Sequence, residues 1–288
     1  MVFDVSHSIA IETEMLTTRT PTPADLPAIV DLTRANRSLL AELEPTFWRK
    51  SANADELHRA FVTFQIANES LIKRVLERDG RVIGYAVSAS HPSGFYLIDD
   101  VCLASDADWR TDGSHLLKSV AERPAIMTAP HRDTARVEAA RAMGLQQIGT
   151  VRSLRFDQKP PLGLSPAPVP VSVPENLASP PMHIFLPAMS PEFVTVVGDG
   201  RGGYAVVSAA ITAPPIYDPG GNPSVVDRVI GKDRQSILMN ALSFASQRGD
   251  VGVILIVGAD DAELAAIADH LGARHPVDMF KWPDSPLV

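Results

Sequence analysis

Two adjacent carboxylates, Asp99 and Asp100, lie inside the apolar segment Phe95–Leu103 and are the side chains best suited to accept a proton. A short polar loop with Arg110 follows, and Gly113 then opens a second apolar segment of helical spacing. A strand, a loop with a glycine and a basic residue, and a helix start are typical of anion binding, because unpaired N–H groups and the helix dipole favour negative charge there. The pattern predicts a loop that holds the diphosphate of a nucleotide-like cofactor.

The two carboxylates cannot both serve one substrate. Successive side chains on a strand point to opposite faces, so only one of Asp99 and Asp100 can face a bound acceptor. The other must pair with a group on the helix-covered face or lie at a break in the strand. Both are candidates for a general base, and a structural role is the alternative for each.

The flanking segments alternate between strand and helix patterns. Thr22-Pro23-Ala24-Asp25 has the residues of a helix start, Asp79-Gly80 is typical of a hairpin turn, and Gly144 is placed as a left-handed helix stop. The spacing of apolar residues predicts strands over 16–20, 71–77, 82–88, 95–103, 125–129 and 147–156, and helices from 23 to about 41, from 51–53 onward, over 113–121 and over 133–143.

Composition excludes several classes of protein. The 288 residues are 45% hydrophobic and 21% charged, as in globular proteins, and the formal net charge of −8 argues against nucleic acid or an anionic membrane as the main partner. One cysteine excludes an internal disulfide, and the eight histidines have no HxH or HxxxH spacing, so no metal site is predicted. Without a signal-peptide pattern or a membrane-length apolar run, we expect a cytoplasmic protein with residues 1–15 as a tail.

The second part of the chain repeats the first in weaker form. Residues 159–181 hold 8 of the 24 prolines and almost no charge, which is typical of an extended linker. Beyond them, an acid and a helix-ending glycine are 45 residues apart, from Asp227 to Gly272, as they are from Asp99 to Gly144. The preserved order and spacing predict a duplicated fold. The second copy lacks the first two helices and has a shorter loop before its Leu238 helix.

The motif next to the loop carries a family resemblance. Val101-Cys102-Leu103 is an apolar triplet at the end of a predicted strand, and Leu116-Leu117 is a leucine pair in the following helix. With the order of strands and helices, this pattern resembles the GNAT superfamily of acyl-CoA N-acyltransferases, over 16–158 well and over 183–288 in part. The resemblance implies an α/β (α+β) fold of two GNAT-like domains, each with a mixed, mostly antiparallel sheet flanked by helices. The first would bind acyl-CoA, 159–182 would be the linker, and 183–288 would be a truncated, degenerate copy.

In that superfamily the loop reads Gln/Arg-x-x-Gly-x-Gly/Ala and holds the diphosphate of coenzyme A. Counting from Leu103 places Gly113 at the second glycine, Thr111 at the first and Asp108 at the Gln/Arg position, so half of the motif is present. The resemblance implies an acetyl-CoA site formed by Val101, Cys102, Leu103, Arg110, Thr111, Asp112, Gly113, Ser114 and His115.

The resemblance also implies catalytic roles. Asp99 has the strand parity of Leu97, where some members carry a base glutamate, so Asp99 is favoured over Asp100 as the base. Asp227, at the equivalent place in a copy not expected to hold cofactor, keeps a structural role open. His131, after the strand over 125–129, is a third candidate that relays a proton, or else a solvent-facing loop residue. The superfamily's general-acid tyrosine is replaced by alanine in both copies, Ala140 and Ala268.

Other side chains near the site keep two interpretations each. His115 either donates a hydrogen bond to phosphate or is simply exposed, and Arg110 is a phosphate contact or a solvated loop residue. Cys102 is favoured as a buried packing residue over a nucleophile. Phe47 and Trp48 are either an apolar plug under a loop or a wall for the acceptor.

These patterns lead to two functional hypotheses. The first is an N-acetyltransferase whose N-terminal domain transfers the acetyl group of acetyl-CoA to an amine of a small molecule or peptide. The second is a catalytically silent protein of the same fold that acts as a sensor or interaction module. No nucleic acid, membrane or metal is expected as a partner, and a homodimer is left open.

Overall fold

The computed structural model describes residues 15–91, 94–122, 124–156, 170–171, 194–209 and 223–283. The elements of the first half are β1 (Leu16–Arg19), α1 (Leu26–Leu43), α2 (Ala54–Ala67), β2 (Ile72–Arg78), β3 (Arg81–Ser90), β4 (Tyr96–Leu103), α3 (Ser114–Val120), β5 (Ala125–Pro130), α4 (Thr134–Ala142) and β6 (Gln146–Arg155). Those that follow are β7 (Pro170–Val171), β8 (Val194–Gly198), β9 (Tyr204–Ala209), β10 (Ser224–Ile230), α5 (Arg234–Arg248), β11 (Gly252–Gly258), α6 (Ala262–His270) and β12 (Arg274–Lys281).

The predicted elements of the first half are confirmed, and the structure adds a π-helical turn. A short 3-10 turn, Pro23–Asp25, precedes α1, and a π-helical turn, Trp109–Gly113, precedes α3. Sequence periodicity did not predict the π-helical turn, because its residues are mostly polar. The tail over 1–14 and most of the linker lie outside the described residues, except that Pro170–Val171 pairs with β8 as a strand. The prediction that the second half lacks two helices falls on 172–193, also outside them.

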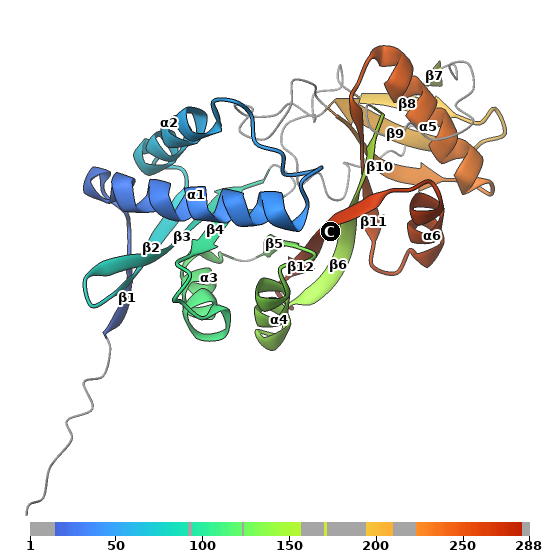
Figure 1. The fold of residues 1–288 in the computed structure, drawn as a ribbon. Coiled ribbons are helices and arrows are strands. Elements are labelled where there is room, and N and C mark those ends of the chain that lie inside the picture. The colour runs from blue at the N-terminus through green and yellow to red at the C-terminus, as the bar shows by residue number, and fades with distance from the viewer. Residues whose placement is uncertain are drawn as a thin grey trace, which may run out of the picture.

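The strands form one twelve-stranded sheet in the order β1-β2-β3-β4-β5-β12-β6-β11-β10-β9-β8-β7. The pairs β4–β5 and β10–β11 are parallel, and the other strand pairs of the described residues are antiparallel. Figure 1 shows β6 and β12 in the middle of this sheet, between the helices α1 to α4 on one side and α5 and α6 on the other. The fold class predicted from sequence is therefore confirmed.

The strand registers support the predicted duplication. In the first half Tyr96 pairs with Ala125, and in the second half Ser224 pairs with Val253, each number being higher by 128. The same shift relates α4 to α6 from their first to their last residues. It also relates Gly144 to Gly272, two glycines with positive φ (79° and 83°) that end these helices. Local conformation therefore repeats together with the sequence pattern.

The last strand of each half pairs with strands of the other half within the one sheet. β12 is the counterpart of β6, yet β12 pairs with β5, while β6 pairs with β11. The two exchanged strands are neighbours, and Val277 pairs with Val151 while Met279 pairs with Gly149. This register is symmetric about the pair formed by Thr150 and Asp278, so a pseudo-two-fold axis passes there.

Alternating residues of the first half feed two separate cores. Val75, Tyr85 and Cys102 pack beneath α1 and α2 on one face, and their neighbours on the other face, such as Leu76 and Val101, pack beneath α3 and α4. Alternation along each strand thus places α1 and α4 on opposite faces of the sheet. A third cluster at the exchanged strands includes Ile126, Val151 and Met279, and the half-buried rings of Phe47 and Trp48 pack against it. That packing favours the plug interpretation of this aromatic pair.

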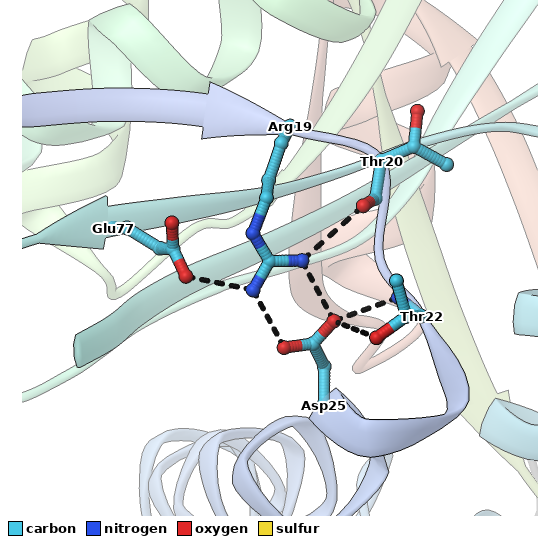
Figure 2. A network of polar contacts seen from close by, with 5 residues as sticks. All are labelled: Arg19, Thr20, Thr22, Asp25 and Glu77. Carbon is cyan, nitrogen blue, oxygen red and sulfur yellow. Dashed lines mark hydrogen bonds and ion pairs between the residues drawn. The ribbon is translucent and has the colours of Figure 1, made fainter. Parts of the chain in front are cut away.

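An ion-pair network fixes the start of α1 to the edge of the sheet. The guanidinium of Arg19 donates to both carboxylate oxygens of Asp25 at 2.7 Å and to Glu77 at 2.7 Å (Figure 2). Asp25 also accepts from the backbone N–H of Thr22 at 2.7 Å, the capping arrangement that the sequence predicted. The hydrogen bond from Arg19 holds the pKa of Asp25 well below its usual range.

Candidate functional site

The backbone N–H groups of the loop between β4 and α3 are hydrogen-bonded to Asp108, a residue of the same loop. The carboxylate of Asp108 accepts from the backbone N–H groups of Arg110 at 2.6 Å and Thr111 at 3.1 Å. Its carbonyl oxygen accepts from the N–H groups of Asp112 at 2.8 Å and Gly113 at 3.1 Å, and the N–H of Ser114 bonds back into the loop. The backbone N–H groups of residues 110 to 114, which were expected to face a diphosphate, therefore already have acceptors within the loop.

A second carboxylate lies under the same loop. Asp112 is 4% exposed, and its oxygen accepts from the Arg78 guanidinium at 2.5 Å and from the N–H of Asp108 at 2.8 Å. The negative groups of this loop are thus satisfied by the protein's own donors. Arg110 and His115 are both exposed, and Arg110 makes a long contact of 3.4 Å with Glu138. Their predicted contacts with phosphate remain predictions.

Trp109 and Arg136 occupy the space beside the loop. A Cβ atom on Gly113 would lie 2.6 Å from a ring carbon of Trp109, so glycine is required there for the ring to pack. The guanidinium carbon of Arg136 lies 4.5 Å from the centre of the Trp109 ring, and its Nη2 donates to Asn36 at 2.9 Å. Asn36 belongs to α1 and Arg136 to α4, so this bond links helices that cover opposite faces of the sheet.

β4 and β5 pair only from Tyr96 to Ile98 and then diverge. A bulge in β4 accompanies the divergence, and Asp100 takes a positive φ of 46° in it. The sequence allowed that one of the two aspartates lies at a break in the strand, and Asp100 lies at this bulge. Asp100 accepts from Gln65 of α2 at 2.7 Å, and Gln65 in turn accepts from the Tyr85 hydroxyl at 3.2 Å.

This network ties Asp100 to a buried part of the first core. The side chain of Asp99, the favoured base, lies outside the described residues, so its role stays a prediction. Burial raises the pKa of the Cys102 thiol to about 12, helped by the nearby charge of Asp100. Such a thiol is protonated at neutral pH and packs in the core, as the favoured interpretation of Cys102 predicted.

The second half has a shorter connection before its helix, as predicted. Residues 231–233 join β10 to α5, where 104–113 join β4 to α3. Asp233 caps α5 through the N–H of Ser236 at 3.0 Å. The guanidinium of Arg234 folds onto Asp261 at the start of α6, with one bond of 2.6 Å. The basic residue nearest this helix start is therefore committed to a partner inside the protein.

The exchanged strands bring together a cluster that sequence spacing did not reveal. Nδ1 of His131 lies 2.9 Å from one oxygen of Asp278, and Nε2 of His275 lies 2.9 Å from the other. The two imidazole rings stack with centres 3.7 Å apart. Gln147 donates to the same carboxylate at 3.0 Å. The ligand atoms of both histidines and Asp278 lie within 4.8 Å of one another, although the sequence has no regular histidine spacing.

The chemistry of the carboxylate sets the tautomers of both rings. Asp278 is 1% exposed, and burial raises its pKa, but the hydrogen bonds from His275 and His131 outweigh burial and hold the pKa below its usual value. An ionised carboxylate only accepts hydrogen bonds, so the facing nitrogens carry protons. Nε2 of a neutral His131 is then left as a base, on a side chain that is 45% exposed. The proton-relay interpretation of His131 gains a partner that the sequence did not indicate.

A pocket of about 680 Å³ opens beside this cluster. Its wall comes from the end of α1 (Glu44), the turn into α4 (His131, Arg132 and Thr134), β6 (Arg152) and the start of β12 (Ala273, Arg274 and His275). Only His131 among these residues was a sequence candidate. The one signal for its partner was an acid, Asp278, inside the apolar strand Val277–Phe280.

Two solved structures resemble the whole chain. A GCN5-related N-acetyltransferase from Sphaerobacter thermophilus superposes with a TM-score of 0.55 at 15% identity, over 95% of this chain and 97% of that chain. A proposed acetyltransferase from Pyrococcus horikoshii gives a TM-score of 0.52 at 10% identity, over 99% and 96%. The chain has the GNAT fold, in a tandem form. At these identities the likeness concerns the fold.

No model of a known protein family matches the sequence, and no curated protein matches it. Within the described residues, no helix combines the length and apolar character needed to cross a membrane. The residues at the acyl-CoA site typical of the GNAT fold are thus identified in this chain by their position in the fold. A functional conclusion therefore depends on the contacts that these residues make.

Proposed function

We propose that the protein is a GNAT-fold binding protein whose first half does not take acyl-CoA into the loop before α3. The capping of that loop by Asp108 carries this proposal, because the N–H groups of Arg110 and Thr111 already bond to its carboxylate. The contact of Arg136 with the Trp109 ring, and its hydrogen bond to Asn36 of α1, add to it, because they fix side chains next to the loop.

The charge of Asp108 makes displacement unfavourable. Two like unit charges 4 Å apart repel by about 1 kcal/mol in water and by about 4 kcal/mol at the effective dielectric near a protein surface, and the Asp108 side chain is exposed. Repulsion between these limits lowers affinity by about fivefold to a thousandfold. The charge of Asp112 beneath the loop is neutralised by its ion pair with Arg78, so the repulsion comes from Asp108. A diphosphate therefore meets repulsion where the superfamily provides unpaired donors.

Calorimetry with acetyl-CoA on the whole chain tests the proposal. We expect no heat and no thermal shift at millimolar ligand for the wild type. Asp108→Gln removes the carboxylate and supplies the residue type of the superfamily motif, so it should bind more tightly. Asp106→Asn is the matched control, because Asp106 is an exposed loop acid paired with Arg81. Saturable one-to-one binding by the wild type at micromolar concentration would overturn the proposal.

The second candidate is an N-acetyltransferase that transfers the acetyl group of acetyl-CoA to an amine. The hydrogen bond between His131 and Asp278, at the end of β5, favours it. An amine with a pKa of about 10.4 is almost fully protonated at pH 7, and Nε2 of His131 is a base that could take its proton. Ala140, in place of the superfamily's tyrosine, offers no acid to the departing thiolate, which would take its proton from water.

This candidate is tested by release of the coenzyme A thiol with a panel of small amines and peptides. Turnover should fall at least a hundredfold in His131→Ala and Asp278→Asn. His270→Ala, which changes an exposed histidine at the end of α6 and outside both candidate sites, should keep the wild-type rate. Amine-dependent thiol release by the wild type would refute the silent binding protein and establish the enzyme.

A further inference from the structure

The pocket beside the exchanged strands is built from distant parts of the chain. Glu44 lies at the end of α1, Arg132 precedes α4, Arg152 lies on β6 and Arg274 opens β12. Those four side chains therefore meet only because β12 is inserted between β5 and β6. The pocket is a product of the tandem arrangement rather than of either half alone.

The pocket wall is rich in arginine although the chain is acidic. Three arginines and one glutamate line it, in a protein of formal net charge −8, and one of the three, Arg152, is paired with Asp269 at 3.1 Å. The buried charge of Asp278 reduces the positive charge, but both of its oxygens already accept from the rings of His131 and His275. The wall therefore presents guanidinium groups and imidazoles.

The arginines retain donors for a ligand. Arg132 donates to the carbonyl of Leu43 at 3.2 Å and has no ion pair with a carboxylate among the residues that the structure describes. Arg274 pairs through one nitrogen with Glu44 at 2.9 Å. Each guanidinium has five N–H groups arranged to bind carboxylate or phosphate. Both side chains are exposed.

We infer that this pocket binds a small organic anion through a carboxylate or phosphate group held by Arg132 and Arg274. The volume of about 680 Å³ is in the range of small-molecule sites. The inference rests on the proposed function, since it names the class of ligand that such a binding protein takes. Glu44 is the ligand's internal competitor, because it occupies part of Arg274 and is 5% exposed.

Titration calorimetry at low salt, with succinate, L-glutamate and inorganic phosphate as probes, tests the inference on the full chain. Low salt limits screening of the guanidinium charges. We expect at least one anion to bind with a millimolar or lower dissociation constant, and 1,4-diaminobutane not to bind. The dicarboxylate and phosphate arms separate the two head groups. A parallel acetyl-CoA titration reports separately on the proposed function.

Three variants and a control locate the binding site. Arg132→Gln and Arg274→Gln should each weaken the best anion at least tenfold, and Glu44→Gln should strengthen it several-fold by releasing Arg274. Arg201→Gln is the control, because Arg201 is an exposed arginine in the turn between β8 and β9. Unchanged thermal midpoints would show that the variants remain folded. For any variant that does not fold, anion-induced chemical-shift changes around His131 in the wild-type protein locate the site instead.

Two outcomes would overturn the inference. One is that none of the three anions binds, or that the best anion binds equally to wild type, Arg132→Gln and Arg274→Gln. The other is that EDTA-treated protein binds Zn²⁺ in a manner lost in Asp278→Asn, and binds anions only when Zn²⁺ is present. The cluster of His131, His275 and Asp278 would then be a metal centre.

Discussion

The exchange of β6 and β12 predicts that the first half cannot fold alone as a monomer. A fragment of residues 1–158 retains β5 and β6 but loses β12, which lies between them, and β11, which pairs with the outer side of β6. Both remaining strands then have unpaired backbone groups along edges that are internal in the whole chain. The boundary after residue 158 therefore marks a sequence repeat whose fold depends on the other copy.

The cost can be estimated from the buried side chains of β12. Val277, Met279 and Phe280 are 4%, 0% and 0% exposed. Burying one such side chain contributes about 1.5–3 kcal/mol, so losing three removes roughly 5–9 kcal/mol before any backbone hydrogen bond is counted. The net stability of a folded domain is about 5–15 kcal/mol. The loss is thus comparable to the whole free energy of unfolding.

Circular dichroism and light scattering after size exclusion measure the outcome. We expect the fragment to be unfolded, or to fold only as a dimer in which a second β6 takes the place of β12, as the pseudo-two-fold axis at Thr150 and Asp278 permits. A full chain cleaved at a protease site inserted into residues 159–169 is the control, and its halves should stay associated. A monomeric fragment with a cooperative thermal transition would refute the exchange.

Three further predictions concern the first half. Burial and then the charge of Arg37 lower the pKa of His58 to about 4. The neutral ring therefore contributes fully to the free energy of unfolding above the unfolded pKa of about 6.5, and this contribution is lost as the pH falls toward 4. Urea unfolding should show a loss of about 2–3 kcal/mol between pH 7 and 4.5, and His58→Gln should reduce that loss. Arg37→Ala removes a side chain that is 1% exposed and paired with Asp55, and it should lower the free energy of unfolding in urea by about 3 kcal/mol. Arg34→Ala, at an exposed neighbour, should change the free energy of unfolding by no more than about 0.5 kcal/mol, and equal losses would contradict the burial argument. Arg19→Lys should cost about 1–2 kcal/mol in thermal unfolding, because lysine cannot bond both oxygens of Asp25, and an unchanged midpoint would mean that the network in Figure 2 is not stabilising.

Local patterns predicted the elements because the signals are local. Thr22 and Asp25 cap a helix wherever it packs, and Asp79-Gly80 turns a hairpin through positive φ at both residues. The partner of a strand is not encoded in the same way. β6 and β12 alternate equally well beside either half, so the sequence revealed the duplication but not the exchange.

The candidate site was predicted in position more than in chemistry. The loop lies where the motif placed it, but the consequence of Asp108 was underestimated. An aspartate two residues before Arg110 is a helix-capping signal, and its carboxylate takes the donors that the cofactor would need. His131 and Asp278 are 147 positions apart, and no spacing rule connects residues whose contact depends on an exchanged strand.

The histidine cluster occurs on one side of the pseudo-two-fold axis, because the two copies carry different residues at the equivalent positions. Shifting by 128 relates His275 to Gln147 and Asp278 to Thr150, and the latter two are partners across the axis. His131 corresponds to Ala259 in the second copy. The same backbone geometry therefore exists twice around the axis, but only one side carries two imidazoles. Gln147 now donates to the carboxylate that its own counterpart also contacts. Different residues at three pairs of equivalent positions, on a symmetric backbone, are enough to place a polar cluster on one side of the exchanged strands.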